Sequence, residues 1–230
     1  MTFSVKARRL HRLLALFIGL QMMIWLLSGC YMVLMNIDYI RGNQLTQPLT
    51  STLPISDITI NPAELAVLYP DHSELQLYMT ALGPRYKLTF DNEQLIVSAS
   101  DAKILPKLTQ AEAEVIAKSS YAGQKAWLSS HYIEDKPPSE LSPRWLPVWQ
   151  INFGTDSLYV SATTAEVVTK RHDYWRLFDV MWMLHIMDYQ HRENIHNWLL
   201  TLAASLASLM AFTGILLTYN RFRPVRESKR

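Results

Sequence analysis

The chain has 230 residues, of which 49% are hydrophobic and 18% charged, and its net charge is +2. These averages are ordinary for a soluble protein, but most of the apolar excess lies in two runs near the ends, and the middle is polar enough to fold in water. The net charge comes from two basic ends, so we expect no nucleic acid partner. The single cysteine, Cys30, excludes an intrachain disulfide and a cysteine-based metal cluster.

The first apolar run extends from Leu13 to Met35 without a charged residue and is long enough to cross a bilayer as a helix. Arg8, Arg9 and Arg12 precede it. Because basic flanks stay on the cytoplasmic side of a bacterial inner membrane, we expect this end of the chain in the cytoplasm.

A lipoprotein signal peptide is the competing interpretation of this run. Leu27-Ser28-Gly29-Cys30 has the small-residue pattern of a cleavage site ahead of a lipid-modified cysteine. The apolar sequence continues beyond it to Met35, where a mature lipoprotein would begin a polar tether. We therefore favour Cys30 as a small residue packed in a helix over lipidation of Cys30.

The second apolar run is uncharged from Trp198 to Tyr219 and is also long enough to span a bilayer. A basic cluster follows it, consisting of Arg221, Arg223, Arg226, Lys229 and Arg230. This end is therefore expected in the cytoplasm as well, and the region between the two spans in the periplasm.

Aromatic residues recur at steps of three and four before the second span, which predicts a helix with one aromatic face. Such a helix is typical of the membrane surface. The expected membrane anchors are Trp175, Phe178, Trp182 and Trp198.

The middle of the chain contains an internal repeat. Residues 86–90 and 95–105 recur at the same spacing as residues 149–153 and 158–168. Each copy alternates apolar and polar residues in two short runs joined by a turn, which predicts a hairpin. A further strand and a helix precede each hairpin, so the predicted unit is a helix followed by three antiparallel strands.

The second copy has two features of its own. Thr109 and Glu112 have the spacing of a capping box at the start of its helix. Residues 135–144 form an insertion whose prolines exclude it from a sheet, and we expect an exposed loop there.

These residues resemble two related families. The strands at 158–168, and more loosely at 95–105, resemble the PepSY domain. Arg9-Leu10-His11-Arg12, Trp182-Met183-Leu184-His185 and Thr213-Gly214 resemble the PepSY-associated transmembrane family. The resemblance covers nearly the whole chain.

The two apolar runs, the internal repeat and the resemblance together predict an α+β fold in which two transmembrane helices flank a periplasmic region of two tandem PepSY-like repeats, each a helix with an antiparallel sheet. The expected segments are residues 1–12 (cytoplasmic basic tip), 13–35 (first transmembrane helix), 36–57 (linker), 58–108 (first repeat), 109–172 (second repeat), 173–196 (interfacial amphipathic helix), 197–219 (second transmembrane helix) and 220–230 (cytoplasmic basic tail).

The resemblance also implies two kinds of function. Soluble PepSY domains act as inhibitory or binding modules associated with peptidases, and larger membrane PepSY proteins with four spans include haem-bearing reductases of ferric siderophores. This chain has two spans and no glycine-rich nucleotide-binding motif, so we do not expect an autonomous reductase.

Four of the seven histidines, His172, His185, His191 and His196, precede the second span. A membrane haem needs two axial ligands at similar depth. His185 with His196, or His185 from two subunits, could hold haem b, whereas His11 lies at the opposite edge of the bilayer and is a weaker candidate. The alternatives are hydrogen bonding at the membrane surface without chemistry, which we favour, and binding of a divalent ion.

We therefore expect a non-enzymatic, inner-membrane-anchored periplasmic protein that acts as a binding or accessory module, with envelope iron or siderophore handling implied by resemblance. The alternatives are a haem b-bearing electron-transfer subunit of the ferric-siderophore reductase type and a regulator of a periplasmic peptidase. The expected partners are the lipid bilayer, a periplasmic or membrane protein, and a second copy of the chain. Small residues on the second span favour close helix pairing, namely Ala203, Ala204, Ser205, Ala207 and Ser208.

Overall fold

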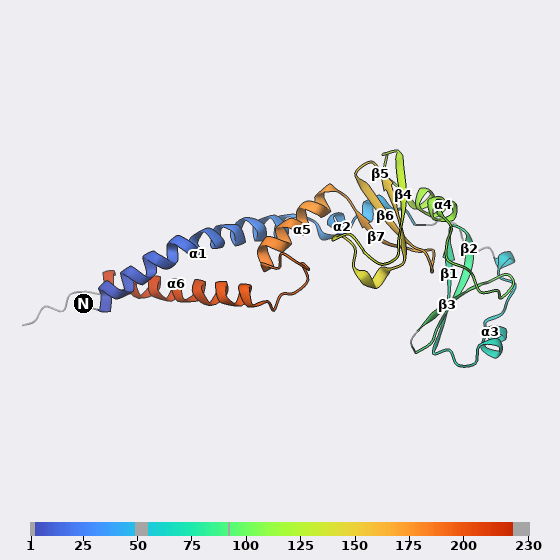
Figure 1. Ribbon diagram of the computed structural model, residues 1–230, viewed down its shortest axis with the longest axis horizontal. Coiled ribbons are helices and arrows are strands. Elements are labelled where there is room, and N and C mark those ends of the chain that lie inside the picture. The colour runs from blue at the N-terminus through green and yellow to red at the C-terminus, as the bar shows by residue number, and fades with distance from the viewer. Residues whose placement is uncertain (1–2, 49–54, 92, 223–230) are drawn as a thin grey trace, which may run out of the picture. The chain divides into compact units, whose positions relative to one another are not determined.

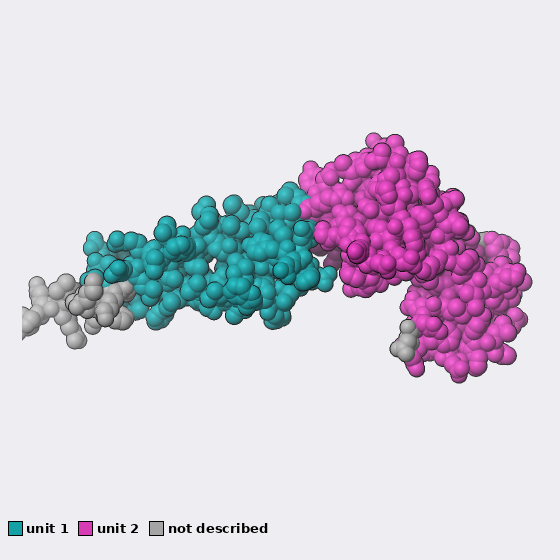
Figure 2. Space-filling view, viewed as in Figure 1, with its two compact units in different colours: residues 1–36, 177–230 teal, residues 37–176 magenta. Residues whose placement is uncertain are grey.

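A computed structural model describes residues 3–48, 55–91 and 93–222. The chain divides into two compact units (Figures 1 and 2). The first contains residues 1–36 and 177–230, and the second contains residues 37–176. The α+β class is confirmed, with an apolar helix near each end and antiparallel sheets between them.

The first unit is built on two long helices, α1 (Phe3–Leu34) and α6 (Trp198–Phe222), which lie side by side and antiparallel (Figure 1). The windows that pass the length and hydropathy test for a membrane span are Arg8–Leu34 and Trp198–Phe222, each with mean hydropathy 2.0. Only 17% of the apolar window of α1 and 11% of that of α6 are buried, unlike the core helix of a soluble domain. Most of the predicted basic tail, residues 223–230, lies outside the described residues.

The buried and half-buried residues of α1 recur every three or four positions, so they lie on one face of the helix. Leu14, Ile18 and Ser28 are buried on α1, and Ala203 and Thr213 on α6. Of the small residues expected to pack closely, Ala203 is the one fully buried. The others that were named, Ala204, Ser205, Ala207 and Ser208, are exposed or half-buried, so a role for them in contact with another helix stays a prediction.

Helix α5 (Asp173–Ile186) is shorter than the predicted interfacial segment. Residues 187–197 form a compact loop instead of continuing the helix to residue 196. The Asn197 side chain closes this loop, because its amide donates to Ile186 O at 2.9 Å while its carbonyl accepts Leu200 N–H at 2.8 Å, at the start of α6.

The second unit contains both repeats. The first has α3 (Pro62–Leu68) and a sheet of β1 (Glu74–Thr80), β2 (Gly83–Thr89) and β3 (Gln94–Ser98), in that order. Asn61 caps α3 by accepting Ala63 N–H. Its core residues are Leu65, Tyr86, Leu88, Val97 and Ala99.

The second repeat has α4 (Gln110–Ser120) and a sheet of β4 (Trp127–Ile133), β5 (Val148–Phe153), β6 (Asp156–Ser161) and β7 (Val167–Arg171), in that order. The predicted capping box between Thr109 and Glu112 is present. The sheet has one strand more than predicted, since β7 pairs with β6 where the first repeat has a single bridge between Val97 and Ile104. The main core consists of Leu108, Ala113, Ile116, Ala117, Ile151, Phe153, Leu158, Val160 and Ala165.

Part of the predicted linker 36–57 is folded. Short helices occur at Ile37–Ile40 (α2), Asn43–Leu45 (η1) and Ile55–Asp57 (η2). Gln47 N–H donates to Ser120 O at 2.9 Å, and Leu45 is buried, so the segment before residue 48 packs on the second repeat and is not a free spacer.

The insertion 135–144 is exposed at both ends but buried at Leu141, so the prediction of an exposed loop was wrong for its middle. Leu141 is buried against Val148 and Tyr159. Glu140 accepts the Tyr159 hydroxyl at 2.6 Å and Arg176 Nε–H at 2.8 Å. Burial, followed by contact with Glu140, raises the pKa of Tyr159. Proline excludes the insertion from the sheet, but it does not prevent packing on the sheet's face.

Candidate functional site

The His11 side chain contacts α6 through its ring nitrogen Nδ1. Its Nδ1 lies 3.0 Å from Thr213 Oγ1 and 3.1 Å from Met210 O. Because the Thr213 hydroxyl donates its own hydrogen to Met210 O at 2.9 Å, His11 must donate from Nδ1. The ring also lies against Gly214, where a Cβ would come within 3.1 Å of His11 Cε1.

His185, on α5, forms the same kind of contact with a hydroxyl on α1. Its Nδ1 lies 3.0 Å from Ser28 Oγ, which donates to Ile24 O at 2.7 Å, so His185 is also the donor. A Cβ on Gly29 would lie 3.3 Å from His185 Cε1. Both histidines therefore keep Nε2 as the nitrogen with a free lone pair when the ring is neutral.

The structure separates His11, the weaker haem candidate, from His185, and the pairing of His185 with His196 stays a prediction. His11 and the His185 contact at Ser28 lie 17 residues apart on α1, which is about 25 Å along a helix, so the two rings cannot share one iron in a monomer. His196 is exposed, and its backbone N–H donates to Asn194 Oδ1.

The two remaining histidines of this cluster are placed differently. His191 is exposed. His172 is buried in the second unit with Nε2 2.9 Å from Tyr39 O, which is a structural role. Among the described residues, no group of three or more His, Cys, Asp or Glu side chains could hold a metal ion.

Asp188 organises the loop between α5 and α6. Its carboxylate accepts the backbone N–H groups of Gln190, His191, Glu193 and Asn194 at 2.9 to 3.3 Å. These bonds, Asn194's first, lower the pKa of Asp188 to about 2. Trp182 Nε1–H donates to Arg192 O, and Arg192 pairs with Asp179, so the loop is also tied to α5.

The predicted membrane anchors have different surroundings. Trp175 lies under the Arg171 guanidinium at 3.9 Å, Phe178 is near Tyr31, and Trp182 is bonded to the loop. Trp198 is largely exposed at the start of α6. Cys30 is exposed on α1. Anchoring by these four aromatic residues stays a prediction, and lipidation of Cys30 stays the disfavoured alternative.

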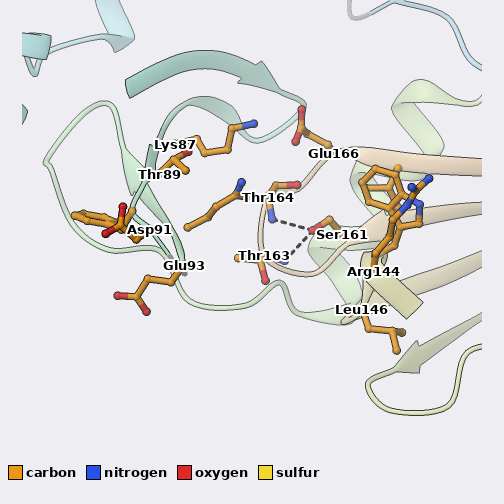
Figure 3. A pocket seen from close by; sticks show the side chains of 14 residues that line it. Lys87, Thr89, Asp91, Glu93, Arg144, Leu146, Ser161, Thr163, Thr164 and Glu166 are labelled. Carbon is orange, nitrogen blue, oxygen red and sulfur yellow. Dashed lines mark hydrogen bonds between the residues drawn. The ribbon is translucent and has the colours of Figure 1, made fainter. Parts of the chain in front are cut away.

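A groove of about 850 Å³ lies between the two repeats of the second unit (Figure 3). One wall comes from β2 and the β2–β3 turn, with Lys87, Asp91 and Glu93. The other wall comes from the β6–β7 turn with Glu166, and from the short helix η3 (Pro143–Trp145) with Arg144. Tyr78 joins the walls by donating its hydroxyl to Thr164 O at 2.8 Å.

The groove and its surroundings contain polar groups without a partner within the described residues. Within the described part of the chain, none of its five charged side chains makes an ion pair. The Thr164 hydroxyl oxygen is buried there without a hydrogen-bond partner among the described residues. Arg85 lies on the same face of β2 as Lys87, is 6% exposed, and its Nη1 has no partner in the same part of the chain. Buried polar groups normally have partners, so this region is typical of a binding site.

The sequence did not predict the groove, because its walls come from segments far apart in the chain.

The model of the PepSY-associated TM region family matches residues 8–230. The chain belongs to this family. The match confirms the resemblance drawn from the sequence motifs, and with the two apolar helices it identifies a membrane protein. Neither a curated protein nor a solved structure matches the chain.

The histidine contacts predict which glycines of this PepSY-associated TM protein tolerate a side chain. Gly29→Ala and Gly214→Ala place a methyl group against His185 and His11 and should each be about 1–3 kcal/mol less stable than Gly19→Ala, which meets nothing within 4 Å. All three substitutions gain the same helix propensity, so Gly19→Ala is the matched control. Thermal unfolding of the detergent-solubilised protein measures the difference, and three equal midpoints would contradict the contacts.

Because the Asp188 carboxylate holds the loop between α5 and α6 together, we expect the loop to open when Asp188 loses its negative charge. Since folding lowers the pKa of Asp188, its contribution is complete above the ordinary carboxyl pKa near 4 and is lost as the pH falls towards about 2. At neutral pH, Asp188→Asn should increase the rate of trypsin cleavage after Arg192 several-fold. Glu193→Gln, a neighbouring acid-to-amide change at an exposed side chain, should not. Equal cleavage of the two variants would contradict this role for Asp188.

Proposed function

We propose that the chain is an inner-membrane protein whose region 37–176 lies in the periplasm and binds a partner protein without catalysing a reaction. The groove between the repeats carries this proposal, because its charges of both signs are unpaired within the described part of the chain. A polypeptide segment offers both signs of charge together with backbone donors and acceptors. The three carboxylates outnumber the two cations and so disfavour an anionic small molecule.

The proposed orientation rests on charge. Arg8, Arg9 and Arg12 are exposed near the start of α1, and Arg221 is exposed near the end of α6. Basic residues of this kind stay in the cytoplasm, and two spans then return the chain to its starting side.

Resemblance to membrane PepSY proteins supports a setting in envelope iron or siderophore handling, and resemblance to soluble PepSY domains supports a peptidase as an alternative partner.

Site-specific photo-crosslinking tests the groove. With p-benzoylphenylalanine at Trp145, which is exposed and lines the groove, the full chain in living cells should form a discrete adduct with a partner protein. Arg144→Glu in the same chain should weaken that adduct, because it removes a groove cation. The same photoreactive residue at Leu68, exposed on α3, is the control. Absence of an adduct at Trp145, or an equal one at Leu68, would contradict the proposal.

A haem b-bearing electron-transfer subunit is the second candidate, and the His185 contact favours it. Metal-ligating histidines usually donate their other ring N–H to a fixed acceptor, as His185 does to Ser28. Haem would supply one-electron transfer to a ferric substrate or redox partner. The second axial ligand would be His196 or the same histidine of a second subunit.

Absorption spectra of the detergent-purified protein, oxidised and then dithionite-reduced, decide this candidate. It requires a Soret band that is lost in His185→Ala. Ser28→Ala removes only the acceptor, so it should shift the spectrum or weaken haem retention. A protein that stays colourless when expressed with added haem excludes the candidate.

A further inference from the structure

One end of the α1–α6 helix pair carries positive charge and no acidic residue. Arg8 and Arg12 on α1 and Arg221 on α6 are exposed there. Residues 3–12 and 213–222 contain no Asp or Glu. Neither Arg12 nor Arg221 forms an ion pair with a described residue. This end of the pair therefore offers cations to a ligand from outside the chain.

The contact between His11 and Gly214 places these arginines on one edge of the helix pair. A Cβ on Gly214 would lie 3.1 Å from His11 Cε1. Arg8 lies one turn before His11 and one turn from Arg12, and Arg221 lies two turns beyond Gly214. Because the helices are antiparallel, Arg8 and Arg221 lie towards the same end and differ in level by about 6 Å. Both guanidinium groups can therefore reach one phosphate group between them.

This arginine edge continues into the apolar part of the helices as a row of small residues. Ala15 and Gly19 follow Arg8 and Arg12 at steps of three and four on α1, and a Cβ on Gly19 meets nothing within 4 Å. On α6, the residues that precede Arg221 at the same steps are Ala211, Gly214 and Thr218. The opposite edge of the pair instead carries exposed bulky side chains, namely Leu13, Phe17, Leu20, Leu209 and Phe212. The arginine edge alone has room for an acyl chain.

We propose that the arginine edge binds an anionic phospholipid of the leaflet that borders this end of the helices. Arg8, Arg12 and Arg221 donate hydrogen bonds to its phosphate, and one acyl chain lies along the small residues. Arginine suits this role because its planar guanidinium group can donate two parallel hydrogen bonds to a phosphate. Basic residues between membrane helices commonly bind lipid headgroups in this way.

The depth of the arginines fits a headgroup. Exposed Tyr219 lies on α6 between the levels of Arg8 and Arg221, and tyrosine is enriched where headgroups meet the hydrocarbon. A lipid fits better than a free phosphate ion, because the open apolar edge continues directly from the cations. The argument holds for either orientation of the chain in the membrane, so it does not depend on the function proposed above.

Native mass spectrometry of the full chain, purified in detergent and mixed with phosphatidylglycerol, tests the proposal. Arg12→Gln and Arg221→Gln should each retain about fivefold less lipid than the unsubstituted chain. Arg9→Gln is the matched control, because Arg9 is exposed at the same end but lies on the side of α1 away from α6. It should retain as much lipid as the unsubstituted chain. Equal loss in all three variants would overturn the proposal, because it would show unspecific attraction to a basic surface, and no loss in any of them would overturn it as well.

Two further measurements test the acyl chain. Ala15→Leu fills the arginine edge without changing its charge and should also lower lipid retention several-fold. Ser208→Leu, on the exposed side of α6 away from α1, should not. An excess of inorganic phosphate at constant ionic strength should leave the lipid bound. Displacement by phosphate, or equal retention in Ala15→Leu and Ser208→Leu, would overturn binding of a lipid along this edge.

Discussion

The bilayer is the constraint on which the rest of this structure depends. Hydrocarbon offers no water to hydrogen-bond a polar group, so a spanning segment must be helical and its polar side chains must find partners within the protein. Helices α1 and α6 meet this requirement in part, through long uncharged runs and through hydroxyls that bond back to their own helix, such as Ser28 to Ile24 O and Thr213 to Met210 O. The hydroxyl oxygens then accept the N–H groups of His185 and His11. Gln21 Nε2 and Trp25 Nε1 on α1 are buried without a hydrogen-bond partner among the described residues.

The two units of the chain differ in how their polar side chains are used. In the membrane unit, His11 and His185 are each held by a hydroxyl and pack on a glycine, which fixes the tautomer and limits the space around the ring. In the unit of residues 37–176, two copies of one small α+β element build a groove. Charged side chains of both signs that make no ion pair with described residues are typical of surfaces that bind other polypeptides.

The sequence predicted those elements whose signals are local. Runs without charge identified both spans, the Thr109 capping box identified the start of α4, and alternating residues around each turn identified both hairpins. Motifs around His11 and His185 also identified the family.

What the sequence did not predict depends on contacts between distant residues. The burial of Leu141, the convergence of Tyr159 and Arg176 on Glu140, and the fourth strand β7 arise only when the second repeat is folded. The same holds for the groove, whose walls come from both repeats and the insertion. His185 was a sequence candidate, but its partner Ser28 lies 157 residues away and has no sequence signal.

The most direct test of the account is the side of the membrane on which each segment lies. In a Cys30→Ser chain, Ser100→Cys marks the region between the spans, and Asn220→Cys marks the end of α6; both side chains are exposed. The account predicts that a membrane-impermeant maleimide labels Ser100→Cys in intact spheroplasts, and labels Asn220→Cys only after lysis. Labelling of Asn220→Cys before lysis, or protection of Ser100→Cys until lysis, would contradict it.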